Sequence, residues 1–71
     1  MEYIGKIHHA GSTIEAHVDV RMCHGDIEAE FCTSLAYVDD EVVLLDEVSE
    51  TLQMLLIDDA HDQWAMEVDE S

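Results

Sequence analysis

The chain is very poor in basic residues, because Lys6 and Arg21 are its only lysine and arginine among 71 positions. Proteins that bind nucleic acid directly do so with clustered Lys and Arg side chains that neutralise phosphates. Two isolated cations cannot form such a cluster, so we expect no direct binding of nucleic acid. An anionic membrane surface would repel the chain as well.

Cysteines are few, prolines are absent, and no hydrophobic run is long. Two cysteines are too few for a secreted disulfide scaffold, and the start at residues 1–4 lacks the basic and apolar regions of a signal peptide. The longest apolar runs, at 42–45 and 54–57, are far shorter than the roughly 20 residues that span a bilayer. These features predict a cytoplasmic protein without a membrane segment.

Acidic residues are abundant: 18 are Asp or Glu, and the formal net charge is -16. The chain is nevertheless 48% hydrophobic, and its apolar residues are patterned, which is typical of a folded domain and not of a disordered acidic tail. We expect one domain over residues 1–71. A chain this short buries only about 60% of its unfolded surface, so homodimerisation or a partner would add useful burial.

The first half of the chain shows the alternation of apolar and polar residues that a half-buried strand requires. We predict strands at about 2–9, 13–23 and 26–37, joined by two-residue turns at Ala10-Gly11 and His24-Gly25. This register places Met22 opposite Ile27, Val20 opposite Ala29, Val18 opposite Phe31 and Tyr3, and Ile7 opposite Ile14. The predicted inner face consists of Tyr3, Ile7, Ile14, Ala16, Val18, Val20, Met22, Ile27, Ala29 and Phe31.

The second half changes to helical spacing, and a helix at about 46–62 is predicted to cover the sheet. Residues 41–45 form either a short fourth strand or the start of a longer helix, and the β-branched Val42 and Val43 favour the strand. From Trp64 onward an edge strand is a further alternative, and the acidic tail at 67–71 is expected to fray. The predicted fold is α+β: a three- or four-stranded antiparallel meander packed against one C-terminal α-helix.

The predicted outer face of the sheet is acidic. Lys6 faces Glu15 and Arg21 faces Glu28, so both cations are expected to be used in cross-strand pairs. Two candidate partner-binding arrays remain: a row across the sheet (Glu2, Asp19, Glu30) and a cluster around the helix (Asp46, Glu47, Glu50, Asp58, Asp59, Asp62). Like charges in a row destabilise a sheet. They either serve a cationic partner or form an ordinary solvated surface.

The five histidines and two cysteines lack the paired spacing of a zinc site, and we expect no metal or cofactor. The best alternative is His17 facing Cys32 with His8 on the neighbouring strand. Cys23 and Cys32 would lie about 20 Å apart, too far for a disulfide. No serine has the glycine neighbours of a nucleophile elbow, so no enzyme activity is expected.

In size, charge and predicted build, the chain resembles the phage-encoded acidic inhibitors that mimic nucleic acid, of the anti-CRISPR and anti-restriction types. The resemblance implies a basic nucleic-acid-binding protein or complex as the partner, in the cytoplasm of the host. It implies no particular site residues. Two alternatives are an acidic domain adapted to high salt, favoured by the single lysine, and an accessory subunit that binds a basic protein without mimicry.

Overall fold

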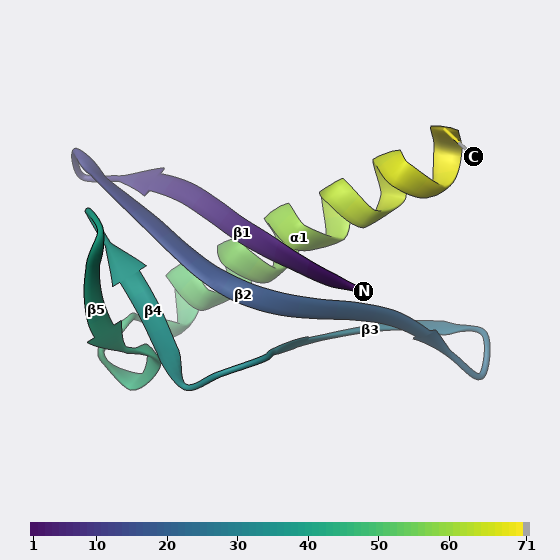
Figure 1. The fold of residues 1–71 in the computed structure, drawn as a ribbon, viewed down its shortest axis with the longest axis horizontal. Helices are drawn as coiled ribbons and strands as arrows, with labels where there is room; N and C mark the ends of the chain where they lie inside the picture. Colours follow the sequence, from purple (N-terminus) through teal and green to yellow (C-terminus); the bar gives the residue numbers. More distant parts are fainter. Residues whose placement is uncertain (71) are drawn as a thin grey trace.

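The protein is a five-stranded antiparallel sheet with one C-terminal helix packed on it, so the predicted α+β class is confirmed (Figure 1). The computed structural model describes the backbone of residues 1–70 and the side chains of residues 1–68. The elements are β1 (Glu2–His9), β2 (Ser12–Cys23), β3 (Asp26–Phe31), β4 (Leu35–Val38), β5 (Glu41–Leu44), a 3₁₀ turn (Leu45–Glu47) and α1 (Glu50–Glu70).

The long strand β2 organises the sheet. β1 pairs along one of its edges, while β3 and β4 share the other edge and β5 follows β4. The predicted register is confirmed at every pair named above, for example Ile7 with Ile14 and Met22 with Ile27. The two turns predicted at Ala10-Gly11 and His24-Gly25 have positive φ at both residues, as type I′ hairpins require.

The predicted single strand at 26–37 is wrong, because the chain bulges at 32–34. Between the pairs Val18 with Phe31 and Glu15 with Tyr37, β2 advances by three residues and the facing chain by six. Three extra residues change the alternation of side chains, so Ala36 points into the core and Tyr37 points to the outer face. The sheet consequently has five strands, whereas three or four were predicted.

Residues 41–44 form a strand, as the β-branched pair indicated, and not the start of a long helix. The connection from β4 is the two-residue turn Asp39-Asp40, and both of its residues have positive φ. Asp is one of the few residues that tolerate this conformation, because its short polar side chain bonds to the nearby backbone.

The predicted helix bounds of 46–62 are also wrong, since α1 runs over Glu50–Glu70. Ser49 accepts the N–H groups of Leu52 and Gln53 at 3.4 and 3.0 Å, through its hydroxyl and its carbonyl respectively, and so begins the helix. The helix continues because Leu56, Ala60 and Trp64 keep one apolar stripe against the sheet. The alternative of an edge strand from Trp64 is therefore wrong, and in the tail residues 67–70 are helical while Ser71 lies outside the described residues.

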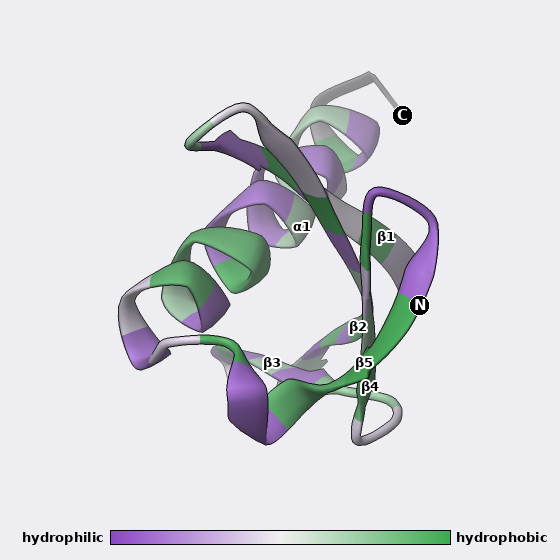
Figure 2. Ribbon diagram, turned by 90° about the vertical axis from the view of Figure 1, so that its left-hand side faces the viewer, coloured by the Kyte–Doolittle hydropathy of each residue, from purple (hydrophilic) through white to green (hydrophobic). Residues whose placement is uncertain are grey.

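The core lies between the helix layer and the sheet layer (Figure 2). Leu56, Val18 and Val20 are its largest fully buried side chains. Gly5 allows α1 to pack closely on β1, because a Cβ at this position would clash with the carbonyl oxygen of Leu56. The predicted inner face differs only at the hairpin tip, where Met22 is 60% exposed and Ile27 is 42% exposed. There the β2–β3 hairpin and the C-terminal end of α1 splay apart (Figure 1).

Candidate functional site

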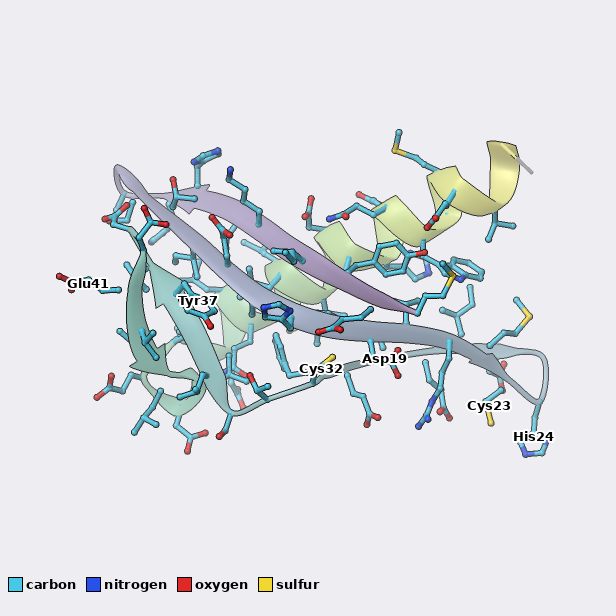
Figure 3. The ribbon with its side chains drawn as sticks, in the orientation of Figure 1. Asp19, Cys23, His24, Cys32, Tyr37 and Glu41 are labelled. Carbon is cyan, nitrogen blue, oxygen red and sulfur yellow. The ribbon has the colours of Figure 1, made fainter. Side chains whose placement is uncertain are left out.

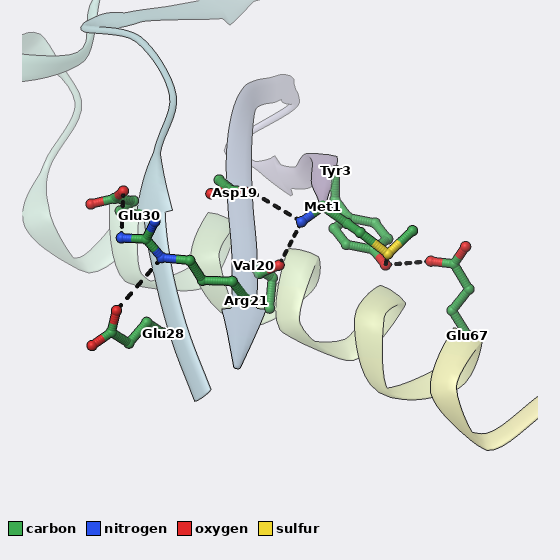
Figure 4. A network of polar contacts seen from close by, with 8 residues as sticks. All are labelled: Met1, Tyr3, Asp19, Val20, Arg21, Glu28, Glu30 and Glu67. Atoms are coloured by element: carbon green, nitrogen blue, oxygen red, sulfur yellow. Dashed lines mark hydrogen bonds and ion pairs between the residues drawn. The ribbon is translucent and has the colours of Figure 1, made fainter. Parts of the chain in front are cut away.

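The acidic row across the sheet forms in the predicted register, with Glu2 opposite Asp19 and Asp19 opposite Glu30. Each carboxylate is engaged within the chain, however. Asp19 lies 3.1 Å from the amino group of Met1, and Glu30 lies 3.4 Å from the Arg21 guanidinium (Figure 4). Glu2 lies 2.9 Å from Nδ1 of His17. The row therefore presents less free negative charge than its sequence implies.

Arg21 and Lys6 behave differently from each other. Arg21 pairs with Glu28 at 3.6 Å, as predicted, and reaches Glu30 as well. Lys6 faces Glu15 in the register, but its ammonium forms no ion pair within residues 1–68. The prediction that both cations are consumed in cross-strand pairs is thus wrong for Lys6.

The second array retains its charge. Five of its six carboxylates are exposed and form no ion pair with the described residues; we call them the acidic helix surface: Asp46, Glu47, Glu50, Asp58 and Asp62. Asp46 and Glu47 lie in the 3₁₀ turn, before the helix begins. The sequence holds no Lys or Arg after Arg21, so no Lys or Arg of this half can neutralise the surface.

Asp59, the sixth carboxylate, does not belong to this surface. It is half-buried, and its Oδ2 accepts hydrogen bonds from the backbone N–H of Lys6 at 2.9 Å and from Nε2 of Gln63 at 3.0 Å. Gln63 also donates to the carbonyl of Ile4 at 2.8 Å. These bonds fasten α1 to the outer edge of β1, so Asp59 has a structural role.

Exposed apolar side chains lie beside the acidic helix surface. Met54, Leu55 and Met66 are 66%, 45% and 65% exposed. Met54, Asp58, Asp62 and Met66 follow one another at intervals of four residues and so share one side of the helix. An apolar residue within an acidic stripe is an available anchor for a protein partner. Trp64, the one tryptophan of the chain, is not available in this way, because it packs against the core.

The outer face of the sheet contains an apolar strip that the sequence prediction missed. Leu35, Val42 and Leu44 are 38%, 58% and 55% exposed on β4 and β5. Tyr37 lies on the same face (Figure 3). It borders a hollow of about 280 Å³ with Ile4 and His17. No periodic signal in the sequence marked this strip, because Leu35 and Tyr37 turn outward only through the bulge at 32–34.

Cys32 lies opposite His17, as the register predicted, and its N–H donates to the His17 carbonyl at 3.0 Å. Desolvation raises the pKa of the Cys32 thiol, and the neighbouring carboxylates of Glu2 and Asp19 raise it further. A raised pKa keeps the thiol protonated and so weakens it as a nucleophile. Cys23 and Cys32 are both free.

The alternative metal site of His17, Cys32 and His8 does not bring its third residue close to the other two. The β1 residue opposite His17 is Ile4, so His8 lies four residues further along the strand, about 13 Å away. His8 instead forms a hydrogen bond with the hydroxyl of Thr13 at 3.1 Å. Within the described residues, no group of three or more His, Cys, Asp or Glu side chains is arranged to hold a metal ion.

Two carboxylates stabilise the fold from the surface. Tyr3 donates a hydrogen bond to Glu67, which raises the pKa of Tyr3 to about 12 and joins β1 to the last turns of α1. Asp39 accepts the N–H of Thr13 at 3.0 Å, and this bond, with one from Ser12, lowers the pKa of Asp39. Neither residue belongs to the acidic helix surface.

Comparison with protein-family models, with curated proteins and with solved structures finds no match to this chain. Among the described residues, no helix combines the length and the apolar character needed to cross a membrane. We therefore infer the function from the charge and the geometry of the chain itself.

Proposed function

We propose that this protein is a small acidic inhibitor that binds a basic nucleic-acid-binding complex of a host, in the host cytoplasm, and occupies the site that DNA or RNA would use. The observation that supports this proposal is the acidic helix surface. Its carboxylates are exposed and form no ion pairs with the described residues, whereas each carboxylate of the sheet row has a hydrogen-bond or ion-pair partner within the chain. The site that we propose is therefore the helical array without Asp59.

The spacing of these carboxylates suits such a partner. Side chains three or four residues apart on a helix lie about 5 to 6 Å from one another. Phosphates on one strand advance about 3.4 Å along the duplex axis and more along the curved backbone. Asp58 and Asp62 thus offer negative charges at a separation that Lys and Arg side chains arranged for phosphates can reach.

Charge and apolar contacts are expected to affect different steps of binding. A net charge of -16 steers the protein towards a positive groove and raises the association rate, particularly at low salt. Exposed Met54, Leu55 and Met66 bury apolar area after contact and slow the dissociation. Because Met side chains are flexible, they can adapt to grooves of different shape.

A capture experiment followed by a salt titration tests the proposal. The tagged full chain is used to isolate a partner from host lysate, and the purified pair is measured between about 50 mM and 500 mM salt. We expect the partner to be a nucleic-acid-binding protein and the affinity to fall by at least about tenfold, because exposed charges are screened beyond roughly 10 Å at 0.1 M. An affinity independent of salt would contradict the proposal.

A further inference from the structure

The sheet has three edge strands, β1, β3 and β5, and the β1 and β5 edges differ in how they are covered. At the β1 edge, Asp59 accepts the N–H of Lys6 and Gln63 donates to the carbonyl of Ile4, so side chains of α1 occupy two of the outward backbone groups. Beyond β4, β5 is the last strand, and no described element lies beyond it (Figure 1). An open edge strand is a template for pairing with another chain.

Hydrogen-bond geometry identifies the free groups of β5. The N–H of Leu45 donates to the carbonyl of Ser34 at 2.8 Å, and residues that bond to the neighbouring strand alternate along an antiparallel pair. Val43 therefore bonds to β4, while Val42 and Leu44 direct their N–H and C=O groups away from it. Two donors and two acceptors are thus available at this edge.

The side chains at this edge are apolar on the outer face. Val42 and Leu44 are more than half exposed, and Leu35 extends the strip onto β4. The edge has neither a lysine nor a proline, which commonly protect edge strands. A strand added here would gain backbone hydrogen bonds from Val42 and Leu44 and apolar contacts from the strip.

Acidic residues stand at both ends of the strip and define the chemistry of the occupant. Asp40 and Glu41 precede its apolar residues, and Asp46 and Glu47 follow them. β5 has four residues, about 13 Å of strand, so an apolar segment with Lys or Arg at each end matches this pattern. A second copy of the chain would bring a further charge of -16 and the same acidic ends, which opposes self-pairing.

We propose that the free edge of β5 is a docking site for an extended basic segment of a partner protein, which adds as a sixth strand beside Val42 and Leu44. The mode is strand addition, in which main-chain hydrogen bonds give affinity and alternate side chains give specificity. This inference goes beyond the proposed function, because it concerns the edge of β5, which adjoins the acidic helix surface at Asp46 and Glu47, and requires no nucleic-acid-binding partner.

Hydrogen exchange on the full chain tests the proposal, with synthetic peptides as probes. One peptide alternates valine and threonine and carries two lysines at each end, and its control carries glutamates in place of the lysines. We expect the lysine peptide to slow exchange at the Val42 and Leu44 amides at least about tenfold, and the glutamate peptide to leave it unchanged. Failure of either peptide to behave so would overturn the proposal.

Paired proline variants locate the docking site. Val42→Pro removes an N–H that points to solvent and leaves the bonds to β4 intact, whereas His8→Pro removes an outward N–H from the β1 edge. We expect Val42→Pro to weaken the lysine peptide at least about tenfold and His8→Pro to leave its affinity unchanged. Equal effects of the two variants would overturn the proposal. So would a dimer of the free chain, seen by sedimentation, that Val42→Pro abolishes. If Val42→Pro fails to fold, exchange in the unmodified chain decides alone.

Discussion

The carboxylate of Asp59 accepts a hydrogen bond from the backbone N–H of Lys6 at 2.9 Å. This contact joins the middle of α1 to the edge of β1, next to the position where Gly5 meets Leu56. An acidic residue that by its sequence resembles its exposed neighbours is therefore part of the framework. Its neighbour Asp58 is exposed and makes no such contact with the described residues.

Replacing Asp59 with alanine should destabilise the fold, because the N–H of Lys6 and the amide of Gln63 lose an acceptor. We expect a loss of about 1 to 3 kcal/mol in the free energy of unfolding, measured by urea titration. Asp58→Ala is the matched control and should change stability by less than about 0.5 kcal/mol. Equal effects of the two substitutions would contradict the structural role of Asp59.

Asp39 should contribute stability that depends on pH. Its pKa in the folded chain is lowered from an ordinary value near 3.8, so its contribution is complete above that value and is lost as pH falls through the folded pKa. The Asp39→Asn variant is the comparison, because Asn also tolerates positive φ but carries no charge that is lost at low pH. We expect the stability difference between the two proteins to be constant near neutral pH and to shrink below about pH 4.

Thermal unfolding of both proteins from about pH 2.5 to 7 provides this measurement. Comparing the two proteins cancels the contribution of the other carboxylates, whose mutual repulsion falls as they become protonated. A stability difference that stayed constant over the whole range would show that the bond from Thr13 does not depend on the Asp39 charge.

Charge reversal should separate the two acidic arrays. Asp58→Lys combined with Asp62→Lys is expected to lower the affinity for the captured partner on the order of a hundredfold, about 2.7 kcal/mol. Glu2→Lys combined with Glu30→Lys makes the same change in net charge on the sheet row and should cost less than about tenfold, through lost steering alone. Isothermal titration checks both pairs, and a larger loss from the sheet row would place the binding surface there.

The alternative of high-salt adaptation makes an opposite prediction about folding. If the acidic surface serves a partner, the chain should unfold cooperatively by circular dichroism in about 50 mM salt as well as in about 2 M salt. A chain adapted to high salt would be unfolded at the lower concentration, because its carboxylates repel one another without screening. That outcome would remove the support for a partner.

Alternation of side chains was sufficient to predict the β1–β2–β3 register, because one buried face allows only one pairing. It was not sufficient to predict the bulge at 32–34, whose three short polar residues carry no periodic signal. The outward apolar strip depends on that bulge and was missed with it. The helix end was missed because Trp64 continues the stripe of Leu56 and Ala60, where alternating Met66 and Val68 resembled a strand.

The two acidic arrays could be located from the sequence, but the sequence did not reveal which array has internal partners for its carboxylates. Their charges differ in effect because Arg21, His17 and the amino terminus reach the sheet row, and these contacts depend on side-chain placement. The role of Asp59 depends on how closely α1 approaches β1. Gly5 permits that approach, and a glycine does not reveal in the sequence which element will pack against it.

Competition between nucleic acid and this protein for the captured partner is the most direct test of the central claim. The partner is saturated with its DNA or RNA, and binding of the labelled chain is followed by fluorescence anisotropy. We expect the chain and the nucleic acid to exclude each other, with each displacing the other in proportion to its concentration. A stable complex that holds both at once would contradict mimicry and would identify the chain as an accessory subunit.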